Sequence, residues 1–157
     1  VLEVDGQSIP QTGAIFRYLG KKLGLNGKTD FEGAWVDAIF DQYKDYYVDF
    51  TKFYYIAIGY KEGDLEKVRK EFGEPSRDKY FSLVTQQLQQ NESGFLVGDD
   101  VTYVDFFIAE HVLAVWTRLP GFFDNFPEVL EHQKKIHGLP KIKNYMESRP
   151  EMPMKIN

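Results

Sequence analysis

The sequence predicts an α+β fold in two unequal parts, a short β-β-α unit followed by an all-helical domain. Three observations indicate this division. Residues 1–10 alternate between apolar and polar around a turn at Asp5 and Gly6, which is typical of a β-hairpin. Strand signals disappear after residue 30. Residues 102–118 are apolar on nearly every side, as expected of a helix buried at the centre of a helical domain.

Composition narrows the possible functions. The 157 residues are 43% hydrophobic and 16% aromatic, which is enough apolar material for a core. A formal net charge of −5 gives no electrostatic reason to bind nucleic acid or an anionic membrane. The chain has no cysteine, which excludes disulfides and cysteine nucleophiles among these residues and suits a cytoplasmic location. No apolar run approaches the roughly 20 residues that span a bilayer.

The β-β-α unit is expected over residues 1–24. Pro10 lacks an amide hydrogen and should end the second strand. A helix is then indicated by apolar residues at helical spacing, namely Ala14, Ile15, Tyr18, Leu19 and Leu23. A lone hairpin is marginal in water, so we expect that further strands precede Val1 and complete a sheet.

Residues 25–30, which are rich in glycine and asparagine, are predicted to link this unit to a helical domain over residues 31–157. A long helix is expected first, capped by Thr29 or Asp30 and running to about residue 58. A short helix capped by Asp64 and another opened by Pro75 and Ser76 should follow. After them come the apolar helix and two shorter helices over residues 126–137 and 140–148.

Two local patterns add detail to these helices. Thr102 and Asp105 have the spacing of a capping box at the start of the apolar helix, where each side chain binds the backbone amide of the other. In the last helix, the buried face is expected to consist of Ile142, Tyr145 and Met146.

The first candidate site is the helix start at Gln11 and Thr12. The first turn of a helix offers unpaired amides and the positive end of the helix dipole. A hydroxyl and a carboxamide added there would make a site for a small carboxylate or phosphate. The alternative is that Thr12 simply caps its helix.

A second candidate is a row of four aspartates at four-residue intervals, Asp37, Asp41, Asp45 and Asp49. Like charges at this spacing repel each other on a helix, so the row should be offset by cations. Lys44, Lys52, a basic patch of a partner subunit, a ligand ammonium group or a divalent ion are all possible. The alternative is a solvated acidic face.

A third candidate is the concentration of tyrosine and phenylalanine between Tyr43 and Tyr60, which could line an apolar pocket or fill a core or an interface. The three histidines, His111, His132 and His137, have no spacing that is recognisable as a metal site, and we interpret them as surface or hydrogen-bonded core residues.

Several segments together resemble the glutathione transferase family, and the sigma class in particular. The resemblance rests on these segments: residues 1–6, 9–12, 14–15 and 17–19 for the centre of a thioredoxin-like domain, residues 94–99, 102–105 and 109–110 for the capped core helix, and residues 139–145 and 148–150 for the final helix and tail. It implies the C-terminal part of a thioredoxin-like domain followed by the all-α domain of that family.

The resemblance also implies roles for individual residues. Gln11 and Thr12 would hold the carboxylate of the γ-glutamyl group of glutathione, with threonine in place of the usual serine. Gly13 departs from the bulkier residue found there in the family. Asp45 would reach across a homodimer interface to the α-amino group of the partner's glutathione. Lys44 replaces a carboxylate that helps to bind a divalent ion in some relatives, so no metal is expected.

The implied activity is conjugation of glutathione thiolate to small hydrophobic electrophiles, a detoxification reaction. The family's catalytic tyrosine would precede Val1, so no catalytic residue is assigned in this chain. Two alternatives stay open. One is a glutathione-dependent prostaglandin isomerase on the same scaffold, and the other is a non-catalytic crystallin-like or ligand-binding member.

Overall fold

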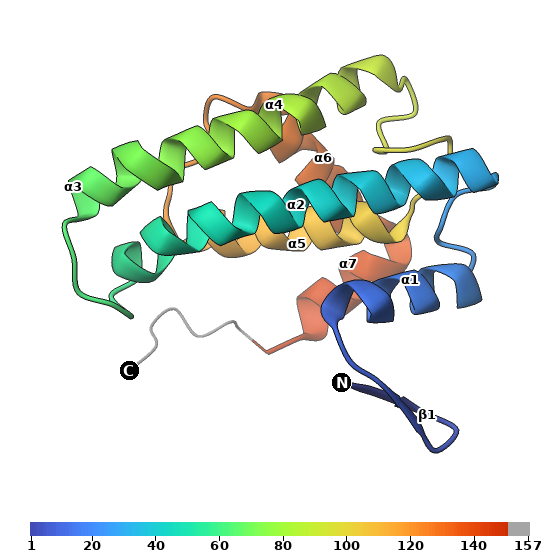
Figure 1. Ribbon diagram of the computed structural model, residues 1–157. Coiled ribbons are helices and arrows are strands. Elements are labelled where there is room, and N and C mark those ends of the chain that lie inside the picture. Colours follow the sequence, from blue (N-terminus) through green and yellow to red (C-terminus); the bar gives the residue numbers. More distant parts are fainter. Residues whose placement is uncertain (151–157) are drawn as a thin grey trace.

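The computed structural model describes residues 1–150; residues 151–157, which the predicted helical domain also includes, lie outside the described residues. A two-stranded antiparallel hairpin of β1 (Leu2–Val4) and β2 (Gln7–Ile9) projects below the bundle of helices (Figure 1). Asp5 and Gly6 both have positive φ angles, 51° and 77°. A two-residue turn of this kind matches the twist of the flanking strands, so the predicted hairpin is confirmed.

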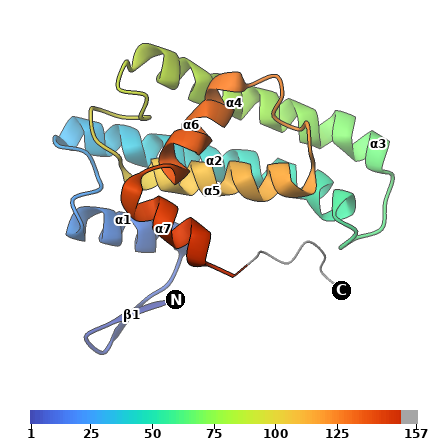
Figure 2. The ribbon, with the colours of Figure 1, turned by 180° about the vertical axis from the view of Figure 1, so that it is seen from behind.

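The helices follow the predicted order. They are α1 (Thr12–Lys22), α2 (Asp30–Ala57), α3 (Leu65–Val68), the π-helical segment η1 (Arg69–Gly73), α4 (Glu74–Gln90), α5 (Tyr103–Arg118), α6 (Pro127–His137) and α7 (Pro140–Ser148). In Figure 1, α2 and α4 run side by side in front of α5, with α1 below them. Seen from behind in Figure 2, α6 lies across α5, and α7 lies below α5 near α1. No helix within residues 1–150 is long and apolar enough to cross a membrane.

Caps set the helix starts. Thr29 caps α2 through its Oγ1, which accepts a hydrogen bond from the Glu32 amide at 3.1 Å, while the Glu32 carboxylate accepts from the Thr29 amide. Of the two residues proposed for this cap, the structure therefore selects Thr29. Asp64 caps α3 by accepting from the amide of Lys67 at 3.0 Å, as expected.

The helix predicted to open at Pro75 and Ser76 is α4, which begins at Glu74 with the proline in its first turn, but no break separates it from α3. The backbone is helical without a break from Leu65 to Gln90, and η1 joins α3 to α4. The Glu74 amide donates to the Arg69 carbonyl, five residues back, so the turn is wider than an α-helical one. The proline ring is tolerated because the i−4 hydrogen-bond ladder is already interrupted directly before it.

The core lies around α5, as predicted. Its largest fully buried side chains are Phe40, Phe50, Phe81, Phe123, Leu96, Ile108 and Ile136. Along α5 itself, Val104, Ile108 and Val112 are completely buried, whereas Trp116 is 46% exposed. The helix is therefore covered on several sides but opens to solvent towards its C-terminal end.

The expectation for α7 is wrong, because no side chain on this helix is buried. Tyr145 is 59% exposed, and Ile142 and Met146 are only partly covered. These three side chains border an open pocket instead of packing into the core. Their helical spacing indicated an apolar face correctly, but spacing alone does not distinguish a core from the wall of a cavity.

The buried carboxylate of Asp105 joins three segments of the chain. Its Oδ2 accepts from the amide and from the hydroxyl of Thr102, both at 2.8 Å, which completes the predicted capping box. Its Oδ1 accepts from the amide of Leu96 at 2.8 Å and lies 2.9 Å from Nε2 of His132. One side chain thus connects the loop before α5, the start of α5 and the middle of α6.

Replacing Asp105 with alanine should destabilise the protein by about 3–5 kcal/mol, because buried partners in three segments then lose their acceptor. The free energy of unfolding in urea measures this loss. Asp99→Ala provides the control, since Asp99 is exposed in the same loop, and it should change stability by no more than about 0.5 kcal/mol. Equal effects of the two substitutions would contradict the role assigned to Asp105.

Candidate functional site

The turn at Gln11 has a strained backbone. Gln11 adopts φ 73° and ψ 121°, a combination that non-glycine residues rarely take. Its carbonyl accepts the first intrahelical hydrogen bond of α1, from the amide of Ile15 at 3.0 Å. Such strain costs roughly 1–3 kcal/mol and is found mainly where the surrounding structure or a ligand requires it. The strain therefore marks this turn as a candidate for binding.

The side chains at this turn leave the helix start open. Gln11 is the N-cap residue and Thr12 the first helical residue, and neither side chain caps the helix. The simple alternative, in which Thr12 caps α1, is therefore not what the structure shows. Both residues are exposed, so the unpaired amides of the first turn, the Thr12 hydroxyl and the Gln11 carboxamide are all accessible to an anionic group.

Gly13 is explained by packing against α2. A Cβ atom added at Gly13 would lie 3.0 Å from Cε1 of Phe40 and 3.3 Å from Nη1 of Arg17. Phe40 is 1% exposed and cannot move away freely. A bulkier residue at position 13 would therefore push α1 away from α2, and this contact accounts for the glycine.

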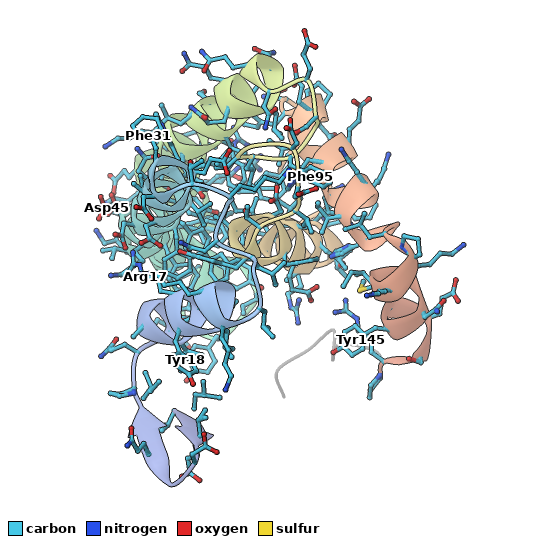
Figure 3. All side chains as sticks on the ribbon, turned by 90° about the vertical axis from the view of Figure 1, so that its right-hand side faces the viewer. Arg17, Tyr18, Phe31, Asp45, Phe95 and Tyr145 are labelled. Carbon is cyan, nitrogen blue, oxygen red and sulfur yellow. The ribbon has the colours of Figure 1, made fainter. Side chains whose placement is uncertain are left out.

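Arg17 on α1 neutralises half of the aspartate row. Its Nε lies 3.1 Å from Oδ1 of Asp37 and its Nη2 lies 2.7 Å from Oδ2 of Asp41. The hydroxyl of Tyr103 also donates to Asp37, at 2.7 Å. This cation is not evident from the sequence, because Arg17 lies on another helix and no spacing relates it to the aspartates. Figure 3 shows Arg17 between α1 and α2.

The aspartates of the row differ in whether a lysine lies near them. Lys44 lies 3.9 Å from Asp41 and Lys52 lies 2.6 Å from Asp49, as two of the proposed pairings require. Asp45 is exposed and has no ion pair among residues 1–150. In Figure 3 its side chain points outward from α2. The four aspartates therefore form no common site, and Asp45 alone keeps an available carboxylate.

An open pocket of about 780 Å³ lies between α1, α2, α5 and α7. Its apolar wall consists of Phe16, Tyr43, Tyr47, Phe50, Tyr54, Phe106, Phe107, Ala114, Val115, Ile142, Tyr145 and Met146. The aromatic segment thus has both predicted roles, because Tyr43 and Phe50 are also part of the buried core. The volume is typical of small-molecule sites, and the lining favours an apolar ligand.

A charged cluster borders the otherwise apolar pocket. Glu110 Oε1 lies 2.9 Å from Nη1 of Arg149, and Glu110 Oε2 lies 3.5 Å from Nε2 of His137. The hydrogen bond with His137, together with Arg149, lowers the pKa of Glu110 despite its partial burial. Glu110 thereby holds the end of α7 against α5 and keeps the pocket wall in place.

His111 occupies the deep side of the pocket between two phenols. Nδ1 lies 3.0 Å from the hydroxyl of Tyr43, and Nε2 lies 3.0 Å from the hydroxyl of Tyr46. Burial lowers the pKa of His111 and raises those of both tyrosines, so all three groups stay neutral. Within the described residues, no group of three or more histidine, aspartate or glutamate side chains is placed to hold a metal ion.

Comparisons with known proteins agree with this architecture. Residues 47–149 match the family described as "Glutathione S-transferase, C-terminal domain". A "probable glutathione S-transferase 9" from Caenorhabditis elegans is 41% identical over 150 residues, which are 96% of this chain and 73% of that protein. The chain belongs to the glutathione S-transferase family.

Solved glutathione S-transferases share the fold. A monomeric one from the hookworm Necator americanus has a TM-score of 0.88 at 43% identity, over 96% of this chain and 73% of the other. A Nu-class one from Haemonchus contortus has a TM-score of 0.85 at 41% identity, over 96% and 72%. Prostaglandin synthase D of Nilaparvata lugens has a TM-score of 0.80 at 27% identity, over 96% and 73%.

Arg17 should hold α1 against α2. In Arg17→Met, Asp37 and Asp41 lose their shared cation and repel each other, so amide hydrogens of α1 should exchange several-fold faster than in the parent. Hydrogen exchange read by mass spectrometry measures this change. Lys44→Met removes an exposed cation that lies near Asp41 alone, and it should leave α1 unaffected. Unchanged exchange in α1 of Arg17→Met would contradict the role of Arg17.

Proposed function

We propose that this glutathione S-transferase family member conjugates glutathione to small hydrophobic electrophiles. The observation that carries the proposal is the proximity of two features, an open and strained helix start at Gln11 and an aromatic pocket that α1 also borders. A polar peptide bound at the first feature would have its thiol near the second. The thiolate sulfur then forms a bond to the electrophilic carbon of the ligand in the pocket; in a substitution the bond to a leaving group such as halide breaks, and in an addition a π bond breaks and the neighbouring atom takes up a proton.

Gln11 and Thr12 would bind the carboxylate of the γ-glutamyl group. The turn offers unpaired amides, a hydroxyl and a carboxamide, all hydrogen-bond donors suited to a negative charge. The backbone strain at Gln11 supports this role, since it holds the amides in a fixed orientation before the ligand arrives.

Asp45 would bind the α-amino group of the glutathione held by a partner subunit. Its carboxylate is exposed on α2 and has no cation among residues 1–150, as this role requires. The proposal implies a homodimer whose sites lie at the interface between subunits. Glutathione is then a co-substrate, and no metal takes part.

Activation of the thiol is assigned to no residue of this chain. A free thiol has a pKa of about 8.5, and only its thiolate is nucleophilic, so a hydrogen-bond donor to the sulfur is needed. The expected donor, a tyrosine preceding Val1, stays a prediction. The sigma class and the cytoplasmic location also stay predictions, and a similar solved structure belongs to the Nu class.

The similarity values favour conjugation over prostaglandin isomerisation. The two transferases from Caenorhabditis elegans and Necator americanus are 41% and 43% identical to this chain, whereas the prostaglandin synthase is 27% identical. A non-catalytic member would keep the pocket but show no turnover. A conjugation assay with an aromatic halide electrophile separates conjugation from the non-catalytic alternative, because a non-catalytic member does not accelerate halide release in the presence of glutathione.

Thr12→Val should weaken glutathione binding to the intact protein about tenfold or more, because a hydroxyl that bonds a carboxylate is lost. Isothermal titration calorimetry measures the affinity. The same substitution should not affect 4-aminobutanoyl-cysteinylglycine, an analogue without the carboxylate. Thr51→Val, a matched control away from the turn, should bind glutathione normally. Equal affinities of Thr12→Val and the parent for glutathione would contradict the assignment of Thr12 to the γ-glutamyl carboxylate.

Asp45→Asn should weaken binding of glutathione by the intact dimer, because the ammonium group loses its counter-charge. Glutaryl-cysteinylglycine lacks that ammonium group, so its affinity should not change. Asp49→Asn is the matched control, since Asp49 lies one helical turn further on and is already paired with Lys52. Sedimentation velocity checks that each variant is dimeric. A monomeric parent, or an unchanged affinity for glutathione in Asp45→Asn, would refute this role.

A further inference from the structure

The three neutral groups around His111 carry more hydrogens than their mutual contacts use. The two phenols and the neutral imidazole have three exchangeable hydrogens between them, one on each hydroxyl and one on the ring. The group contains only two hydrogen bonds, one between the Tyr43 hydroxyl and Nδ1 and one between the Tyr46 hydroxyl and Nε2. Each hydrogen bond uses one hydrogen. One hydroxyl hydrogen is therefore left over, whichever tautomer the ring adopts.

The tautomer decides which hydroxyl is left over. If Nε2 carries the hydrogen, the ring donates to Tyr46, Tyr43 donates to Nδ1, and the Tyr46 hydrogen has no acceptor. If Nδ1 carries it, the ring donates to Tyr43, Tyr46 donates to Nε2, and the Tyr43 hydrogen is left over. A buried donor without an acceptor costs roughly 1–3 kcal/mol, so the tautomer that leaves the more accessible hydroxyl free is favoured.

Tyr46 has no second acceptor. Its side chain is 4% exposed, and its hydroxyl forms no other hydrogen bond within residues 1–150. A smaller cavity does border Tyr46, but it lies between α2 and α4 and no residue of α5 lines it. The Tyr46 hydroxyl, by contrast, lies against His111 of α5. Its hydrogen must therefore point to Nε2.

Tyr43, unlike Tyr46, lies beside the aromatic pocket. Tyr43 and His111 both line the aromatic pocket, so the hydrogen bond between them borders that space. Tyr46 is absent from the lining of this pocket. The Tyr43 side chain is itself 7% exposed, and within residues 1–150 the aromatic pocket is the space that a hydrogen on its hydroxyl can face.

We propose that the Tyr43 hydroxyl is a hydrogen-bond donor to an oxygen of the ligand in this pocket, such as that of a carbonyl, nitro or sulfonyl group. His111 is the positioning residue, because its Nδ1–H holds the Tyr43 oxygen and leaves the hydroxyl hydrogen free. The identity of the ligand as an electrophile rests on the proposed function, but the donor itself does not. The pocket accordingly prefers apolar molecules that carry an acceptor oxygen.

Two probes of similar size test the preference without turnover. Benzophenone and diphenylmethane have the same two phenyl rings, and only benzophenone has an acceptor oxygen. Displacement of 8-anilinonaphthalene-1-sulfonate from the intact protein measures the affinity of each. The parent should bind benzophenone about three- to tenfold more tightly than diphenylmethane, the gain expected from one net hydrogen bond.

Tyr43→Phe keeps the ring and should reduce this ratio to about one while diphenylmethane binding is unchanged, which also shows that the pocket is intact. Tyr47→Phe removes a hydroxyl from the same pocket wall, and there the ratio should persist. A parent that binds both probes equally, or a ratio that survives in Tyr43→Phe, would overturn the proposal. Because no glutathione is present, a failed conjugation assay does not affect this result.

The tautomer of His111 gives a readout that needs no substitution. Nitrogen NMR of the intact protein should show Nδ1 with its hydrogen and Nε2 without one. In the opposite assignment the Tyr43 hydroxyl would donate its hydrogen to Nδ1 and have none for a ligand, which would refute the inference even if Tyr43→Phe were too unstable to study.

Discussion

The carboxylate of Asp105 is the interaction on which the arrangement of the helices depends. It is completely buried and accepts hydrogen bonds from the loop before α5 and from the first turn of α5, and it also contacts His132 on α6. Further contacts connect the start of α5 to α1. The amide of Tyr103 donates to the carbonyl of Leu25, and its hydroxyl donates to Asp37, which pairs with Arg17. The start of α5 therefore locates the small β-β-α unit on the helical domain.

This arrangement brings the two parts of the candidate site together. α1 presents its strained, uncapped start at Gln11 and contributes Phe16 to the pocket, while α5 contributes His111 and Glu110. Glu110 then holds Arg149 at the end of α7, on the opposite wall. The polar and apolar features of the candidate site thus both depend on α5, and a change in the position of this helix would alter both.

Local chemistry predicts most of this fold from the sequence. The turn at Asp5 and Gly6, the cap at Asp64 and the capping box at Thr102 depend on residues within a few positions, and the structure confirms all three. Features that depend on distant segments could not be predicted in this way. No spacing relates Arg17 to Asp37, and the hydrogen bonds of His111 with Tyr43 and Tyr46 join residues more than 60 positions apart. The open face of α7 and the widened turn before Pro75 likewise depend on tertiary packing.

A crystal structure of the intact protein with S-benzylglutathione would test the account most directly, since this one ligand carries both a γ-glutamyl carboxylate and an apolar ring. The account predicts that the carboxylate lies within hydrogen-bond distance of the Thr12 amide and hydroxyl. It also predicts that the benzyl ring packs among the aromatic side chains between α1, α2 and α5. A carboxylate bound away from the Gln11 turn, or a benzyl ring outside this pocket, would contradict it.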